Sequence, residues 1–184
     1  MTKNEYKIGN LIDTTAYYNI YEVQGSDKSY WVKEYRLQFR ITKEYVMNEY
    51  KFHKLSHKLG ASPQIIDIIG PYSTTHDEVK RMLIIYERYG DGTLTELYLS
   101  GVYQAQKKEI DKYLRGILDT LHENNISHND LHSNNFIYKR VNINEYEFRI
   151  INFGLANLLG DREGKYVIEI PKTYHFINLS LPRI

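Results

Sequence analysis

The chain has 184 residues, of which 42% are hydrophobic, and its net charge at pH 7 is +1. This composition is sufficient for a folded domain with a buried core, and no global charge favours nucleic acid or an anionic membrane surface as a partner. The absence of cysteine excludes disulfides and thiolate metal sites, and no apolar run reaches the ~18 residues that a membrane span needs. The polar start MTKNEYK has no signal-peptide core, so we expect a cytoplasmic protein with no membrane partner.

Strand-like segments fill the first part of the chain. YYNIYEV (17–23) and SYWVKEY (29–35) flank the turn-like stretch QGSDK, which predicts a β-hairpin. Between residues 42 and 59 apolar residues recur at helical spacing, and Gly60 follows as a stop signal. The apolar positions of this helix are Tyr45, Val46, Tyr50, Leu55 and Leu59. SPQIIDIIG (62–70) and RMLIIYERY (81–89) then predict two further strands around a polar loop.

The second part of the chain is richer in helix. After the break GDG (90–92), the segment from about 93 to 124 is mainly helical, most clearly in KKEIDKYLRGILDTLHENN. FIYKR (136–140) and EFRII (147–151) predict a short hairpin around VNINEY, whereas the pattern beyond residue 155 is ambiguous. The apolar positions at helical spacing are Ile110, Tyr113, Leu114, Ile117, Leu118 and Leu121. This order predicts an α+β protein of two small lobes.

The segment SHNDLHSNNF (127–136) carries the clearest chemical signal. It places His128, Asp130 and Asn135 in the pattern H-x-D-L-x-x-x-N, after a long helix and before a hairpin that ends in Asn152-Phe-Gly-Leu-Ala. Here the chain resembles the protein-kinase-like superfamily, whose catalytic loop reads H-R-D-L-x-x-x-N and whose metal loop reads D-F-G. The alternative interpretation is that these residues form ordinary polar turns.

The resemblance implies a role for each matching residue. Asp130 would orient or accept the proton of the attacking hydroxyl group, and Asn135 would offer its amide oxygen to a magnesium ion. Asn152 would occupy the second metal position, and His128 would be a structural residue of the catalytic loop.

Further matches lie upstream. Lys33, on the predicted strand WVKEY, fits the family's strand lysine, and Glu49 on the following helix fits its ion-pair glutamate. This pair would direct Lys33 toward the phosphates of ATP, and we expect it within salt-bridge reach; each residue alone could equally be an ordinary surface residue. ERYGDGTL resembles a kinase hinge, with Tyr86 as gatekeeper and Glu87 and Tyr89 offering backbone groups to adenine.

Two departures from the family pattern concern nucleotide binding. The segment GNLIDTTAYYNIY has only Gly9 where the family has a glycine-rich phosphate loop. Trp31 stands where the family has a small alanine, and strand alternation puts Trp31 on the same face as Lys33. We therefore expect the indole to line or fill the adenine cleft, unless a bulge turns it away.

Two other departures concern the chemistry. Asn152 replaces the metal-binding aspartate and so removes one charge from a site for a hard cation. His132 stands where serine/threonine kinases usually have a lysine, and DLH there is similar to the RIO and aminoglycoside phosphotransferase families. The short segment after residue 157 resembles the small tRNA-modification-complex kinase, or a reduced viral kinase-like protein of the host cytoplasm, and predicts a truncated C-lobe.

These observations predict a single protein-kinase-like domain over residues 1–184, with an N-lobe at 1–89 and a reduced helical C-lobe at 90–184. The resemblance implies an ATP-dependent phosphotransferase of the serine/threonine protein kinase type, using ATP with Mg²⁺ or Mn²⁺ and weakened by Asn152, Trp31 and the missing glycines. The alternatives are a pseudokinase that acts as a binding or scaffold module, and a kinase-fold ATPase or small-molecule kinase. The implied partners are a nucleotide and a protein substrate or binding partner; no residue pattern points to nucleic acid.

Overall fold

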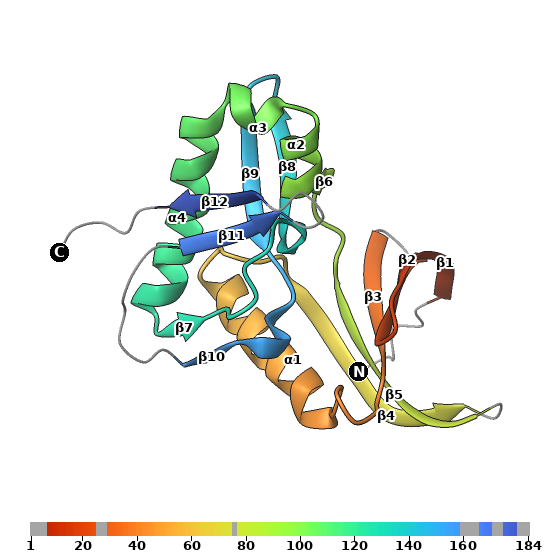
Figure 1. Ribbon diagram of the computed structural model, residues 1–184. Helices are drawn as coiled ribbons and strands as arrows, with labels where there is room; N and C mark the ends of the chain where they lie inside the picture. The colour runs from red at the N-terminus through yellow and green to blue at the C-terminus, as the bar shows by residue number, and fades with distance from the viewer. Residues whose placement is uncertain (1–6, 25–28, 75–76, 159–165, 171–174, 180–184) are drawn as a thin grey trace.

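The computed structural model describes residues 7–24, 29–74, 77–158, 166–170 and 175–179, and its elements form two lobes (Figure 1). The N-lobe is one antiparallel sheet in the order β1-β2-β3-β5-β4, with one helix, α1. Its strands are β1 (Lys7–Thr14), β2 (Tyr18–Gln24), β3 (Ser29–Arg36), β4 (Ile65–Thr74) and β5 (Asp77–Glu87). The two-lobed α+β fold expected from the sequence is therefore confirmed.

The register of the sheet determines which side chains share the face that carries Lys33, and the region between this face and the C-lobe is called the cleft below. In β2 and β3, Tyr18 lies opposite Tyr35, Ile20 opposite Lys33, and Glu22 opposite Trp31. Because directly opposed residues share a face, these six side chains lie on one side of the sheet. The predicted β2–β3 hairpin is confirmed, although part of its turn lies outside the described residues, and β1 is a strand that the sequence patterns did not indicate.

Helix α1 (Lys43–Lys58) begins at Thr42, whose side chain accepts a hydrogen bond from the Tyr45 N–H. This N-cap satisfies one of the free N–H groups of the first turn. The predicted helix is present, but its buried face differs from the apolar stripe expected. Leu55 is 37% exposed. The buried residues of α1 are Val46, Glu49, Phe52, His53 and Ser56.

The C-lobe is built around helix α4 (Lys107–Glu123), whose buried residues are Ile110, Leu114, Ile117, Leu118 and Leu121. The helical segment expected from about 93 to 124 is divided into three helices, which are α2 (Leu94–Leu99), α3 (Val102–Ala105) and α4. A three-stranded sheet in the order β6-β8-β9 packs beside α4 and consists of β6 (Gly92–Thr93), β8 (Phe136–Asn142) and β9 (Glu145–Ile150). The predicted β8–β9 hairpin is confirmed.

The tail that was ambiguous in the sequence contains strands. β7 (Ile126–Ser127) pairs with β10 (Asn157–Leu158), and β11 (Tyr166–Ile170) pairs with β12 (His175–Leu179). Figure 1 shows β11 and β12 side by side in the C-lobe, and β11 contacts the short turn at Ser133–Asn135. No helix in the described part of the chain is both long and apolar enough to cross a membrane.

A column of aromatic rings connects the two lobes. The His128 ring lies 4.8 Å from the Phe153 ring, which lies 5.5 Å from the His53 ring of α1. The His53 ring then lies 5.9 Å from Tyr86, and Tyr86 packs edge-on against Trp31 at 6.3 Å. The column packs α1 against the loop that contains His128 and extends to Trp31 on β3.

Two histidines in this column are buried in the neutral form. Burial lowers the pKa of His53 to about 4, an effect that Lys33 and His57 add to and that Glu49 and the Pro63 carbonyl oppose. Burial also lowers the pKa of His128 below its ordinary value. Both histidine rings of the column are therefore uncharged at neutral pH.

We expect the free energy of unfolding to fall as pH is lowered from about 6.5 to about 4, because the unfolded chain binds a proton at His53 that the folded chain does not. The contribution is fully present above pH 6.5 and amounts to about 3 kcal/mol over the whole window. Urea unfolding across this range, in the wild type and in His53→Phe, measures it. The variant keeps a ring but cannot titrate, so an unchanged pH dependence would contradict the prediction.

Candidate functional site

The cleft is centred on a buried ion pair between β3 and α1. The Lys33 Nζ lies 3.2 Å from the Glu49 Oε1, and both side chains are only 2% exposed. The Tyr35 hydroxyl donates a further hydrogen bond to the Glu49 Oε2. Burial lowers the pKa of Lys33, and the Glu49 carboxylate partly offsets that effect. The expected Lys33–Glu49 contact is therefore present.

Two tyrosine rings enclose the Lys33 ammonium group. Its Nζ lies 4.3 Å from the centre of the Tyr18 ring and 4.8 Å from that of Tyr35, within cation–π range. Burial, with Glu49, Asp13 and Asp130 nearby, raises the pKa of Tyr18 to about 12. The neutral Tyr18 ring therefore packs against the Lys33 ammonium group.

The loop that contains His128, Asp130 and Asn135 is held by several hydrogen bonds. The Asn135 Nδ2 donates to the Asp130 main-chain oxygen at 2.8 Å and to its Oδ2 at 3.2 Å. The His132 imidazole, 3.6 Å from the same Oδ2, is the main group that lowers the pKa of Asp130, and Asn135 adds to this effect. His128 is buried, with its Nε2 2.8 Å from the Ile151 carbonyl oxygen. Asp130 keeps an open carboxylate, since its side chain is 40% exposed.

Asn152 joins the two halves of the cleft. Its backbone is in the left-handed region, with φ 68° and ψ 58°, a conformation that asparagine tolerates better than most residues. Its Oδ1 accepts from the Lys33 Nζ at 2.6 Å, and its Nδ2 donates to the Asn135 Oδ1 at 2.5 Å. The turn that follows is held to α1 by the Asn48 Nδ2, which donates to the carbonyl oxygens of Gly154 and Ala156.

This arrangement leaves few free oxygen atoms to bind a divalent cation. The amide oxygens of Asn135 and Asn152 both accept hydrogen bonds from the protein itself, and the Asp130 carboxylate accepts one from the Asn135 amide. No three His, Cys, Asp or Glu side chains within the described ranges gather where they could hold a metal ion. Because Mg²⁺ favours anionic oxygen ligands, the residues as arranged do not fit it.

The turn between β1 and β2 occupies the place of the missing glycine-rich loop. The Thr15 Oγ1 accepts hydrogen bonds from the N–H groups of Tyr17 and Tyr18, at 3.2 and 3.1 Å. These N–H groups are therefore already bonded, so the turn does not offer them to phosphate. Gly9 serves strand packing, because a Cβ at this position would lie 2.8 Å from the Glu22 carbonyl oxygen.

Trp31 lies on the cleft face with Lys33, as strand alternation predicts, and it packs against the hydrophobic cluster that contains Tyr86. Beside it, an ion pair of 2.6 Å between Arg88 and Glu22 ties the hinge segment to β2. The indole is half-buried, and its role toward adenine stays a prediction.

In the hinge segment, the Glu87 N–H donates to the Gln64 carbonyl oxygen at 2.9 Å, so it is not available to a ligand. The Tyr89 ring stacks on the Arg149 guanidinium group, 5.2 Å away. The roles of Glu87 and Tyr89 toward adenine stay predictions.

Sequence reasoning missed four contributors to the site. Tyr35 could have been found, because it follows Lys33 by two residues and so shares its face. Tyr18 and Thr15 could not, because their positions depend on the conformation of the β1–β2 turn. Asn48 could not have been found either, because a polar residue next to Glu49 on a helix is expected to face solvent.

Comparison with known proteins agrees with this geometry. The family model described as protein kinase domain matches residues 14–176, which is most of the chain. A search of curated proteins found no match. Together with the Lys33–Glu49 pair and the arrangement of Asp130 and Asn135, the match over residues 14–176 shows that the chain belongs to the protein kinase domain family.

Proposed function

We propose that this chain is a catalytically impaired kinase-fold protein, a pseudokinase whose cleft is complete without a divalent cation and which acts by binding other proteins. The observation that carries the proposal is a chain of hydrogen bonds from Lys33 through Asn152 and Asn135 to Asp130.

Each hydrogen bond in this series can have only one direction. The Lys33 ammonium can only donate, so it faces the Asn152 oxygen and leaves the Asn152 N–H₂ toward Asn135. The Asn135 oxygen accepts there, and the Asn135 N–H₂ donates to Asp130. An aspartate at position 152 could not donate to Asn135, so the Asn152 amide takes the place that a cation would otherwise fill. The charge of Lys33 is thus connected to that of Asp130 through neutral amides.

The surroundings of Lys33 support the same proposal. Glu49 and Asn152 take its hydrogen bonds, and the Tyr18 ring covers it. In the β1–β2 turn, the N–H groups of Tyr17 and Tyr18 already donate to the Thr15 side chain. A nucleotide would have to displace several of these contacts at once.

A second candidate is a slow ATP-dependent phosphotransferase of the serine/threonine type, and Asp130 favours it. Its carboxylate is open to solvent, and its lowered pKa keeps it ionised at neutral pH, as a group that orients an attacking hydroxyl must be. A kinase-fold ATPase or small-molecule kinase would use the same group.

The two candidates differ in their response to ligand. A ligand that binds the folded state raises the melting temperature by mass action. For a pseudokinase of this design, we expect no Mg²⁺- or Mn²⁺-dependent shift with ATP in the wild type and no phosphate transfer. A metal-dependent shift with measurable turnover would favour the phosphotransferase.

We expect Asn152→Asp to create a response to divalent cations. The substitution would place a carboxylate oxygen opposite the Asn135 Oδ1, and two acceptors at this distance favour a cation between them. With saturating ATP and Mg²⁺, the variant should gain about 2–3 kcal/mol of stability, a rise of several degrees in melting temperature. Any phosphate transfer that appears should change more in turnover than in nucleotide affinity, because charge at this position acts on the transition state.

Asn157→Asp is the matched control, since it adds the same charge at an exposed position of β10. Asp130→Ala in the Asn152→Asp background should abolish any gained turnover while leaving the cation response of nucleotide binding. If wild type and Asn152→Asp respond equally to Mg²⁺, the amide network is not what limits the site.

We expect Trp31→Ala to raise affinity for ATP by about tenfold, or ~1.4 kcal/mol, because it removes a side chain from the cleft face beside the hinge. Isothermal titration with ATP in the absence of metal tests this directly. Tyr30→Ala, at the neighbouring position on the other face of β3, is the control. Equal or weaker binding by Trp31→Ala would show that the indole does not obstruct the nucleotide.

A further inference from the structure

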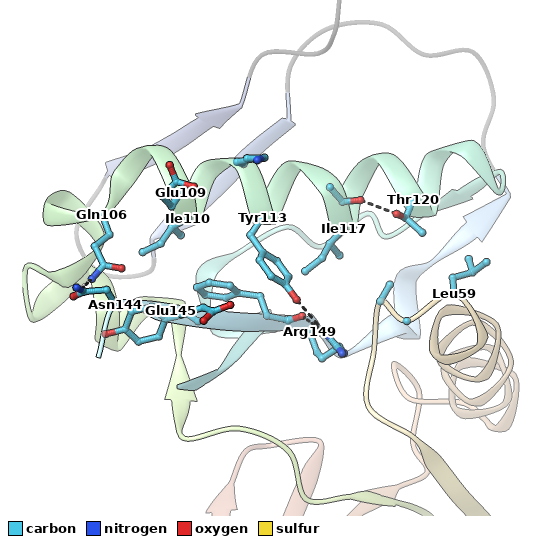
Figure 2. A pocket seen from close by; sticks show the side chains of 16 residues that line it. Leu59, Gln106, Glu109, Ile110, Tyr113, Ile117, Thr120, Asn144, Glu145 and Arg149 are labelled. Atoms are coloured by element: carbon cyan, nitrogen blue, oxygen red, sulfur yellow. Dashed lines mark hydrogen bonds between the residues drawn. The ribbon is translucent and has the colours of Figure 1, made fainter. Parts of the chain in front are cut away.

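Figure 2 shows a hollow between α4, the β8–β9 hairpin and the connection from α1 to β4. Acidic and basic side chains both line it, among them Glu109, Glu145, Lys112 and Arg149, so its charge does not single out one class of ligand. The residues that follow Asn152 lie outside this hollow, and their backbone is held by specific side chains.

The segment 152–158, which we call the Asn152 turn, contains no charged side chain. It consists of Asn152, the short helical turn Phe153–Leu155, Ala156 and β10. In Figure 1 the helical turn lies beside α1, and β10 lies beside β7. The three successive carbonyl groups of residues 154, 155 and 156 all accept hydrogen bonds from asparagine side chains. These asparagines come from different lobes, so the turn is attached to both lobes through its backbone.

Asn48 holds the Asn152 turn from α1. Its Nδ2 donates to the Gly154 carbonyl oxygen at 3.2 Å and to the Ala156 carbonyl oxygen at 2.7 Å. An amide nitrogen carries two hydrogens, so both donors of Asn48 go to this one turn. Tyr45, three residues earlier on α1, packs against the turn as well, because a Cβ at Gly154 would overlap the Tyr45 ring.

Asn129 holds the Asn152 turn from the C-lobe. Its Nδ2 donates to the Leu155 carbonyl oxygen at 3.0 Å. The Ser127 hydroxyl donates to the Asn129 Oδ1 at 2.6 Å, which fixes the direction in which the amide points. The Asn129 backbone has φ 60°, in the left-handed region that asparagine tolerates better than most residues. Ser127 also lies opposite Asn157 in the pairing of β7 with β10, so the turn is bound on this side by side chain and backbone together.

Neighbouring residues of α1 connect these contacts to the buried ion pair. Glu49 binds the Lys33 Nζ, and the same Nζ donates to the Asn152 Oδ1 at 2.6 Å. Asn48, next to Glu49, holds the turn that begins at Asn152. The contacts therefore form a closed ring that runs from α1 through Lys33 and the Asn152 turn back to α1. A movement of α1 away from the turn would break the contacts of Asn48 and Glu49 together.

We propose that Asn48 and Asn129 are positioning residues, which form an amide clamp that keeps Asn152 in its place in the cleft without a ligand. The donors of the clamp are neutral amides and its acceptors are main-chain carbonyl groups, so it needs neither a charged group nor a bound ion. The proposal deepens the proposed function and rests on it, because Asn152 lies at the centre of the hydrogen-bond chain there. Its test reads the Asn152 turn alone and uses no nucleotide, so the two proposals can fail separately.

The test measures hydrogen exchange by NMR in the ¹⁵N-labelled full chain. Two signals report on the clamp: the Asn152 side-chain N–H₂ group, and the Ala156 N–H, which donates to the Phe153 carbonyl oxygen at 3.0 Å. Asn48→Asp keeps the shape of the side chain but cannot donate, and it turns a carboxylate toward two carbonyl oxygens. We expect both signals to exchange at least tenfold faster in this variant, relative to the buried α4 residue Leu118, whose N–H reports on global unfolding.

Asn129→Gly is the second variant, because glycine removes the side chain and suits the positive φ of this position. It removes one hydrogen bond to the turn where Asn48→Asp removes two, so we expect a smaller acceleration in the same two signals, and the largest in the double variant. Asn10→Asp is the matched control, since it adds the same charge at an exposed position of β1 and should change neither signal. Circular dichroism establishes that each variant is folded, and Asn129→Gly alone carries the test if Asn48→Asp is not.

The proposal is overturned if Asn152 exchanges as slowly in the folded variants as in the wild type, since Lys33 and Asn135 would then hold it by themselves. It is also overturned if the two signals accelerate no more than that of Leu118, because the asparagines would then contribute only to overall stability. A failure of the pseudokinase proposal has a different signature, namely a metal-dependent ATP response with turnover in a protein whose turn still responds to both substitutions.

Discussion

The structure depends on one buried ion pair, that of Lys33 and Glu49. Two charges at 2% exposure lose most of their hydration, and their mutual attraction repays that loss only when further hydrogen bonds complete them. The Tyr35 hydroxyl donates a hydrogen bond to Glu49, and the Asn152 amide oxygen accepts one from Lys33. The sheet, α1 and the turn at residue 152 must therefore meet in one arrangement, which also fixes the position of the catalytic loop.

This constraint explains why aromatic and amide groups surround the cleft. The rings of Tyr18 and Tyr35 stabilise the Lys33 ammonium without adding charge, and burial keeps both phenols neutral by raising their pKa. Asn152 offers an oxygen to Lys33 and a donor to Asn135, which an aspartate could not do. Asparagine at this position is therefore consistent with the hydrogen bonds of the rest of the site.

The sequence predicted the parts of this site that follow from spacing and strand alternation. Lys33 and Trp31 share a face because they are two residues apart on β3, and Asp130 and Asn135 meet because one short loop contains both. It failed on α1, where His53 is buried and Leu55 is exposed, because contacts with Phe153 outweigh hydrophobic periodicity. It also failed where geometry depends on tertiary contacts, as in the Thr15 turn and the donor direction of Asn152.

The retained kinase residues do not all carry the same information about function. Removing either member of a buried ion pair typically costs 3–5 kcal/mol, so Lys33 and Glu49 are needed for stability whether or not the protein binds ATP. Asn135 is fully buried and bonded on both sides, and His128 packs in the ring column. Asp130 differs, because its carboxylate is exposed and its contacts with His132 and Asn135 lie at a partly solvated surface, where they contribute little to stability. Its presence is the feature of the cleft that folding explains least, and it is therefore the strongest remaining argument for chemistry.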